Sequence, residues 1–427
     1  MSPSAPETLP PHRLDSLLVV GAGLAGAQTV AALRGRGFTG EITLIGAEEV
    51  EPYDRPPLSK ELLSRPEPAW LQDELGVDVH GGATVHLGET VEALTLSDDD
   101  VRVSTSAGRS VAADAVVLAV GSRPLRPSHW ESASLLHTAD DAAALRERLT
   151  PGHRLVVVGA GWIGAEVAGV AAGAGVQVTV VEAAETPLSR QLGDVGRRTV
   201  PWYEEAGVTL LTGVGVDAVS ERAVHLVDGR VLDADTVLAA VGARPATGWL
   251  VGTVPVDDRG AIATDDVGRA RFRGPGAGRV WAVGDCATRR DDVRGDVAGG
   301  HWSAALLDPD RTAAALLGQE VPATAAPYVF SRQLGHDVAV FGEPDAHDDV
   351  VFREGEHGWA ALYLDPTDDG RTDDEGNPVH ALRAVVLADV PREISGVRKI
   401  LGAAATPDVV VSRATDPSVR WRDAVAR

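Results

Sequence analysis

The chain has 427 residues, of which 44% are hydrophobic and 24% charged, and its 62 acidic side chains outnumber the 39 basic ones. This is the composition of a globular protein with room for about three domains. The single cysteine, Cys286, excludes a disulfide framework, a thiolate zinc site and an iron–sulfur cluster held by this chain, because each needs several cysteines. Any redox chemistry here would therefore need a bound organic cofactor.

The net charge of −23 speaks against nucleic acid as the main partner, because phosphate binding needs clustered Lys and Arg. No apolar stretch of about 18 residues lacks a charge or a break, so we expect no membrane span. Residues 1–14 are rich in proline and have no apolar core like that of a signal peptide, and we read them as a loose tail. These features predict a cytoplasmic protein.

The chain carries an internal repeat, in which residues 17–34 resemble residues 155–172. Each segment has a short apolar run, a GxGxxG pattern and an Ala-rich stretch with helical spacing, which predict the strand, turn and helix of a dinucleotide-binding unit. The first glycine allows a tight turn, the second lets the backbone approach a pyrophosphate, and the third lets helix and strand pack closely. The predicted glycines are Gly21, Gly23 and Gly26 in the first unit and Gly159, Gly161 and Gly164 in the second.

An acid follows each fingerprint at the distance where a ribose hydroxyl is held, about 20 residues on. Glu48 lies 22 residues after Gly26, and Glu182 lies 18 residues after Gly164. The alternative is that these are ordinary strand–helix turns followed by surface acids. Because both units show the same context, we predict two bound nucleotides, between which electrons pass as from a nicotinamide to a flavin.

Further motifs resemble the FAD-dependent, NAD(P)H-dependent ferredoxin reductases of the putidaredoxin reductase and biphenyl dioxygenase reductase type, from about residue 15 to residue 425. The most specific is PYDRPPLSK at residues 52–60. Others are VWAVGDCA at 280–287, HWSAA at 301–305, YVFSRQLGHDVAVFGE at 328–343 and, more loosely, REISGVRKILGA at 392–403. These motifs stand in the order that the family has.

The resemblance implies roles for several residues. Asp285 would bind the flavin's ribityl chain, Lys60 would lie beside the flavin and pair with Glu166 where the nicotinamide enters, and Trp302 would lie beside the isoalloxazine. We take Lys60, Glu166 and Trp302 as the catalytic set. Beyond the six glycines, Lys60 and Trp302, the cofactor-binding set comprises Glu48, Arg55, Val85, Ala119, Gly121, Trp162, Ile163, Glu182, Gly242, Asp285 and His301.

Each of these assignments has a plainer alternative. Lys60 is one of only two lysines, with Lys399, against 37 arginines, which favours a site that needs a compact ammonium, although chance on a surface helix is the alternative. Glu166 could be an ordinary first-turn acid that interacts with the helix dipole. Trp302 could be a core tryptophan, Asp285 a turn residue after a strand, and His301 a residue without a function. No histidine spacing indicates a metal site.

The sequence also departs from the family pattern. Ala119-Val120-Gly121 replaces Ala-Thr-Gly, and residues 136–138 lack an arginine that often precedes the threonine. Residues 365–378 form an acidic insertion that we predict to be a solvated loop. Such reductases often meet acidic ferredoxins through a basic patch, so a chain with this acidic excess must confine the patch to a small area. One candidate cluster is Arg289, Arg290 and Arg294, although Asp291 and Asp292 dilute its charge.

We therefore predict an α/β protein with two Rossmann-like domains of the glutathione-reductase fold and a C-terminal α+β domain. The FAD domain would comprise residues 15–122 and 247–325, the NAD(H) domain residues 123–246, and the C-terminal domain residues 326–427. The predicted activity passes hydride from NADH, rather than NADPH, to FAD, and then single electrons to a two-iron two-sulfur ferredoxin that serves a P450 or an oxygenase. The alternatives are a direct NADH-dependent reductase of a small molecule and a slow-turnover FAD/NADH-binding signalling flavoprotein. The oligomeric state stays open.

Overall fold

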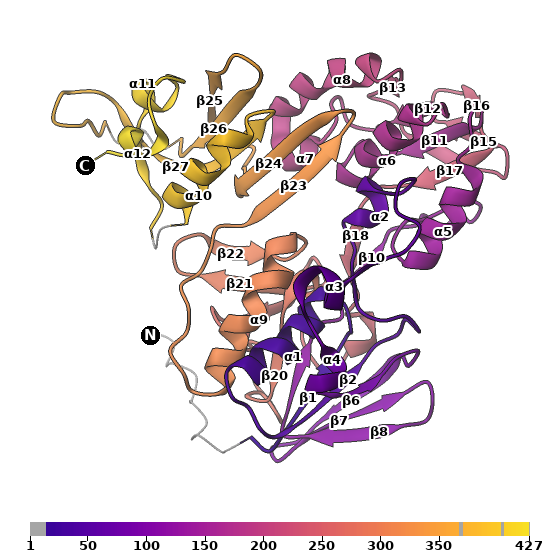
Figure 1. Ribbon diagram of the computed structural model, residues 1–427, viewed down its shortest axis with the longest axis vertical. Coiled ribbons are helices and arrows are strands. Elements are labelled where there is room, and N and C mark those ends of the chain that lie inside the picture. The colour runs from indigo at the N-terminus through magenta and orange to yellow at the C-terminus, as the bar shows by residue number, and fades with distance from the viewer. Residues whose placement is uncertain (1–13, 367–369, 403–404, 427) are drawn as a thin grey trace. The chain divides into compact units, whose positions relative to one another are not determined.

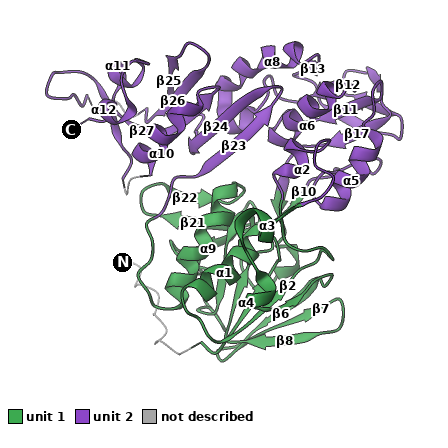
Figure 2. Ribbon diagram, in the orientation of Figure 1, with its two compact units in different colours: residues 1–54, 69–123, 244–323 green, residues 55–68, 124–243, 324–427 purple. Residues whose placement is uncertain are grey.

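The computed structural model describes residues 14–366, 370–402 and 405–426. The predicted tail therefore lies almost wholly outside the described residues, as do residues 367–369 of the acidic insertion. The chain forms two compact units, each assembled from three segments (Figure 2). Unit 1 comprises residues 1–54, 69–123 and 244–323, and unit 2 comprises residues 55–68, 124–243 and 324–427.

Unit 1 is built on a parallel sheet with the strand order β20-β9-β1-β2-β5, of which β20, β1 and β2 are labelled in Figure 1. Its strands are nearly continuous apolar runs, as expected of a parallel sheet buried on both faces. One face is covered by helix α1 (Leu24–Gly35) and helix α9 (Trp302–Leu316), which pack against each other. The strands are β1 (Ser16–Val20), β2 (Glu41–Ile45), β5 (Thr84–His86), β9 (Ala115–Leu118) and β20 (Val280–Ala282).

Smaller elements complete unit 1. An antiparallel sheet packs on the second face of the parallel sheet through apolar side chains that alternate along its strands. It consists of β6 (Val91–Leu96), β7 (Val101–Thr105) and β8 (Ser110–Ala113). A second small sheet consists of β19 (Ile262–Thr264), β21 (Ala287–Asp291) and β22 (Gly295–Ala298). Short elements are β3 (Tyr53–Asp54), β4 (Ala69–Trp70), α3 (Leu71–Leu75) and α4 (Val79–Gly82).

Unit 2 repeats the strand–turn–helix plan on a parallel sheet with the order β13-β12-β11-β17. Helix α6 (Trp162–Gly173) follows β11 as α1 follows β1. The strands are β11 (Arg154–Val158), β12 (Gln177–Val181), β13 (Thr209–Leu211) and β17 (Thr236–Ala239). Around them lie α2 (Pro57–Lys60), α5 (Ala139–Arg148), α7 (Ser189–Leu192), α8 (Val200–Glu205), β14 (Val216–Val219), β15 (Ala223–Leu226) and β16 (Val231–Asp233).

The C-terminal part of unit 2 is an antiparallel sheet with the order β23-β24-β27-β26-β25, with β28 paired to β27. One of its faces shares a hydrophobic core with α6 and the parallel sheet, through side chains such as Val338 and Tyr363. The other face is covered by helix α10 (Ile394–Leu401). The strands are β23 (Tyr328–Gln333), β24 (His336–Gly342), β25 (Asp349–Glu354), β26 (Trp359–Leu364), β27 (Val379–Ala388) and β28 (Asp408–Val410).

The predicted fold class, with two Rossmann-like sheets and a C-terminal α+β part, is confirmed. Within the described ranges, the structure contains no helix that combines the length and the apolar character needed to cross a bilayer.

Candidate functional site

The two GxGxxG turns have closely matching geometries. Gly21 and Gly159 have φ of 107° and 106°, which an L side chain rarely adopts. A Cβ on Gly26 would lie 1.8 Å from the carbonyl oxygen of Gly21, and a Cβ on Gly164 would lie 2.0 Å from that of Gly159. The first and third glycines are therefore required by close backbone packing in both units, as the sequence predicts.

The middle glycine of each turn faces open space instead. A Cβ on Gly23 or Gly161 would meet no atom within 4 Å. Both residues are the N-caps of their helices, α1 and α6, and neither helix start receives a side-chain cap. Backbone N–H groups at an uncapped helix N-terminus bind anions well. Both turns thus fit the pyrophosphate of a dinucleotide.

The two acids after the fingerprints differ in position. Glu182 directly follows β12, where its carboxylate accepts hydrogen bonds from the N–H groups of Ala160, at 2.7 Å, and Ala184, at 2.9 Å. These bonds hold the carboxylate at the fingerprint turn. In unit 1 the residue directly after β2 is Gly46, and Glu48 lies two residues further on, where it accepts a hydrogen bond of 2.7 Å from the Tyr53 hydroxyl.

Asp285 lies beside the unit 1 fingerprint helix. It follows Gly284, whose positive φ of 72° and close approach to Ala25 leave little room for a side chain. Its carboxylate accepts a 2.9 Å hydrogen bond from the hydroxyl of Ser122. Gly284 thereby places a carboxylate next to the start of α1, where a hydroxyl-bearing chain could reach it.

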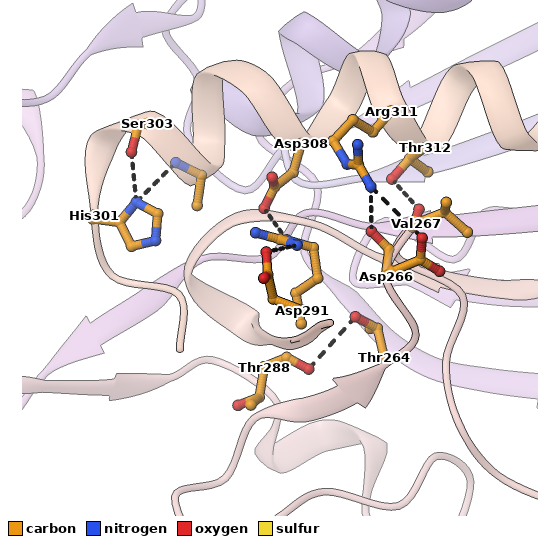
Figure 3. A network of polar contacts seen from close by, with 12 residues as sticks. Thr264, Asp266, Val267, Thr288, Asp291, His301, Ser303, Asp308, Arg311 and Thr312 are labelled. Carbon is orange, nitrogen blue, oxygen red and sulfur yellow. Dashed lines mark hydrogen bonds and ion pairs between the residues drawn. The ribbon is translucent and has the colours of Figure 1, made fainter. Parts of the chain in front are cut away.

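The start of α9 carries His301 and Trp302. His301 is the N-cap, and its Nδ1 accepts a hydrogen bond from the N–H of Ala304 at 3.1 Å (Figure 3). Because Nδ1 is an acceptor, the proton of the neutral ring resides on Nε2. Burial, with a smaller contribution from Arg289, lowers the pKa of His301 to about 4. The Trp302 indole donates to Asp54 at 3.0 Å. His301 is thus a fixed neutral donor at neutral pH.

The predicted basic patch is wrong. Arg289 is buried, with its guanidinium 3.2 Å from Asp291 and 3.4 Å from Asp308. Arg294 also lies largely buried, 3.6 Å from Asp291. The exposed Arg290 pairs with Asp296 at 3.3 Å. All three arginines lie close to aspartates: Arg289 and Arg294 are largely buried, and Arg289 also contacts Asp308 of α9.

Unit 2 brings Lys60 and Glu166 together. Lys60 Nζ lies 2.9 Å from Glu166 Oε1, and the Glu166 side chain is only 3% exposed. Ser59 donates to Oε2 and Ser331 to Oε1, each at 2.5 Å. The carboxylate therefore has three donors, and a buried ion pair is held together by such additional hydrogen bonds. Trp162 and Ile163 begin the same helix, and the Ile163 side chain is exposed.

The remaining predicted residues divide between the units. In unit 1, Val85 lies on β5 beside Leu44, and Ala119 and Gly121 follow β9. A Cβ on Gly21 would meet the Ala119 carbonyl oxygen at 2.2 Å. In unit 2, Gly242 has φ of 110°, and Arg55 donates a hydrogen bond to the His137 carbonyl. The predicted residues are thus divided between the two units.

Cys286 is fully buried, and burial raises the pKa of its thiol to about 11. Its Sγ lies 3.2 Å from the carbonyl oxygen of Leu118. A neutral, buried thiol neither attacks a disulfide nor relays electrons to one. The only cysteine of the sequence is therefore a packing residue.

Sequence reasoning missed four polar residues of these clusters. Asp54 and Ser59 lie within the PYDRPPLSK motif and Ser122 lies in the AVGSRP segment, so their neighbours gave a local signal. Ser331 lies 165 residues from Glu166, and only the fold brings the two together.

Comparison with known proteins agrees with this geometry. Residues 15–306 match the family described as pyridine nucleotide-disulphide oxidoreductase. The chain is 34% identical over 423 residues to the ferredoxin reductase component of chlorobenzene dioxygenase from Cupriavidus sp. strain PS12, covering 95% of this chain and 97% of the relative. It is 32% identical over 425 residues to the ferredoxin–NAD(+) reductase subunit of the benzene 1,2-dioxygenase system from Pseudomonas putida, covering 96% and 98%.

A solved structure is similar as well. The covalent putidaredoxin reductase–putidaredoxin complex aligns with a TM-score of 0.84 at 27% identity, over 96% of this chain and 97% of that one. The likeness extends through the C-terminal sheet, beyond the residues that the family match covers.

Proposed function

The chain belongs to the pyridine nucleotide-disulphide oxidoreductase family and, within it, to the ferredoxin reductases, and from that premise we propose that it is an NADH-dependent, FAD-containing reductase of a two-iron two-sulfur ferredoxin. The observation that carries this proposal is the duplicated fingerprint turn, with the same glycine constraints in both units. Two such turns in one chain supply two nucleotide sites.

Unit 1 holds the flavin nucleotide. When bound, FAD accepts a hydride from NADH and releases the electrons one at a time to the ferredoxin. The N–H groups at the start of α1 bind the pyrophosphate, and Asp285 accepts hydrogen bonds from hydroxyl groups. His301 presents its Nε2–H, and the Asp54 carboxylate orients Trp302. These residues bind and orient the flavin.

Unit 2 holds the nicotinamide nucleotide. Its Glu182 carboxylate is anchored by two backbone N–H groups, so it accepts from ribose hydroxyls and repels a 2′-phosphate, which favours NADH. Lys60 and Glu166 sit by the first turns of α6 and set the charge and geometry of the nicotinamide pocket. We assign them a positioning and electrostatic role, because hydride transfer depends foremost on geometry.

The proposed domain boundaries differ from the bounds of the two compact units, because residues 55–68, which carry Lys60, belong to unit 2. Residues 15–122 and 247–325 form the FAD domain, residues 123–246 the NADH domain, and residues 326–427 the C-terminal domain. The ferredoxin serves an oxygenase, since the names of two relatives place them in dioxygenase systems, or a P450, as the resemblance of the sequence motifs implies. The use of NADH supports a cytoplasmic location, which fractionation of the host cell would check.

The test is anaerobic reduction of the FAD-loaded protein by NADH, followed by cytochrome c reduction with and without a two-iron two-sulfur ferredoxin. We expect rapid flavin bleaching and cytochrome c reduction that depends on the ferredoxin. Flavin bleaching without ferredoxin dependence would favour a small-molecule reductase. Slow bleaching would favour a signalling flavoprotein, and failure to bind FAD would refute the proposal.

A further inference from the structure

The carboxylate of Glu166 is held by three segments that are distant in the sequence. Lys60 and Ser59 come from α2, Glu166 from α6, and Ser331 from β23 of the C-terminal sheet. Ser331 is fully buried, Glu166 is 2% exposed and Ser59 is 5% exposed. Water is therefore largely excluded, so each donor must come from the protein itself. Ser331 is the contribution of the C-terminal sheet.

The hairpin that carries Ser331 turns on two residues with positive φ. Leu334 and Gly335, between β23 and β24, have φ of 54° and 90°, and the left-handed conformation is unfavourable for a leucine. Its side chain is nevertheless buried in the core that α6 shares. A Cβ on Gly169 of α6 would lie 2.6 Å from the Leu334 nitrogen. The turn is thus pressed against α6, one helical turn after Glu166.

We propose that Ser331 is a positioning residue of the nicotinamide site, through which the β23–β24 hairpin fixes the Glu166 carboxylate and, with it, Lys60. Gly169 allows the hairpin to approach, and the Ser331 hydroxyl makes the contact. This inference rests on the nicotinamide role proposed for Lys60 and Glu166. It gives the C-terminal sheet a part in the reduction step, separate from any part in partner docking.

The arrangement of the donors explains why Ser331 matters. Oε1 accepts from both Lys60 and Ser331, whereas Oε2 accepts from Ser59. Without the Ser331 hydroxyl, Oε1 would keep Lys60 as its only donor among the described contacts, and the carboxylate could rotate toward Ser59. The Lys60 ammonium, whose side chain is 20% exposed, would follow the carboxylate or turn to water.

The two lysines of the chain allow a direct test. We would label the FAD-loaded protein with lysine carrying ¹³C at Cε, which gives two NMR signals, one from Lys60 and one from the exposed Lys399 on α10. Lys399→Arg assigns them. We expect Ser331→Ala to shift the Lys60 signal and leave the Lys399 signal in place. The matched control is Thr199→Val, which removes another buried hydroxyl of unit 2, one that donates to the Gly196 carbonyl, and it should move neither signal.

The rate of flavin reduction by NADH tests whether the position of the Glu166 carboxylate affects hydride transfer. A hydrogen bond to a charged group is stronger than one between neutral groups. We therefore expect Ser331→Ala to slow flavin reduction at saturating NADH about ten-fold, while the dissociation constant of NAD⁺ stays nearly unchanged. In a Glu166→Gln background the same change should have little further effect, because Ser331 acts through Glu166. Ser331→Cys, which keeps the volume but donates weakly, should reproduce the Ala result if Ala fails to fold.

An unmoved Lys60 signal in Ser331→Ala would overturn the inference, as would an equal shift in Thr199→Val or a fully additive effect with Glu166→Gln. The NMR readout needs no turnover. If the unmodified protein failed to oxidise NADH, the proposed function would fall, while the Lys60 signal would still report whether Ser331 fixes the ion pair.

Discussion

The two nucleotide-binding halves share their turn geometry and differ in what packs against the helix that follows. Helix α1 packs against α9 of unit 1, whereas α6 packs against β23 and α2 of unit 2. The position equivalent to Glu166, 138 residues earlier, is Gln28. The repeated turn therefore predicts a bound dinucleotide in each half. The elements that pack against α1 and α6 then determine the role of that dinucleotide.

The largest effect should come from filling the third glycine of either turn. In Gly26→Ala the methyl group would overlap the Gly21 carbonyl, so we expect loss of FAD, measured by flavin absorbance after purification and reconstitution. Gly164→Ala should keep FAD and lose reduction by NADH. Gly35→Ala places its methyl group in open space on α1 and should retain FAD. Equal loss of FAD in both fingerprint variants would show that the halves do not bind separate nucleotides.

Replacement of Glu166 tests whether α6 has a role in flavin reduction that α1 does not have. Glu166→Gln leaves the Lys60 ammonium without its charged partner in a largely buried site, which costs up to about 3 kcal/mol. We expect flavin reduction by NADH to slow about 100-fold, by stopped flow, with FAD content unchanged. Gln28→Ala, at the equivalent position of α1, should leave the rate unaltered. A comparable slowing in both variants would contradict a special role for Glu166.

The pH dependence of the free energy of unfolding should report the protonation of His301. Its pKa falls from the usual 6.5 to about 4 on folding, so the unfolded chain binds this proton more readily. The contribution of His301 to the free energy of unfolding is complete above pH 6.5. It is lost as the pH falls toward 4, by up to about 3 kcal/mol. His301→Asn keeps the helix cap and should lack this component in urea unfolding. A variant with the same slope as the parent would place the titration elsewhere.

A smaller effect is expected from Glu182. Glu182→Gln retains an oxygen for the Ala160 N–H but removes the charge that repels a 2′-phosphate. We expect the preference for NADH over NADPH, as the ratio of kcat/KM values, to fall about ten-fold. Glu48→Gln in unit 1 is the matched change and should leave this ratio alone. An unchanged ratio in Glu182→Gln would mean that another residue sets the selectivity.

Local patterns allowed much of the fold and site to be predicted from the sequence. The glycine turns were predictable because the third glycine of each turn lies against the carbonyl of the first, which is close to it in the sequence. The Lys60–Glu166 contact was suggested by a motif. The contact between Ser331 and Glu166 was not, because it depends on how a distant sheet packs on α6. The prediction of a basic patch was wrong for a related reason, because the proximity of the arginines in the sequence does not reveal that Arg289 is buried beside Asp308.

The most direct test of the central claim, that one half holds FAD and the other supplies NADH to it, is an anaerobic titration of the FAD-loaded protein with NADH, followed by flavin absorbance. We expect full bleaching of the oxidised flavin band with one equivalent of NADH, and no bleaching in Gly164→Ala with its FAD retained. An unreduced flavin in the unmodified protein, or full bleaching at the same rate in Gly164→Ala, would contradict it.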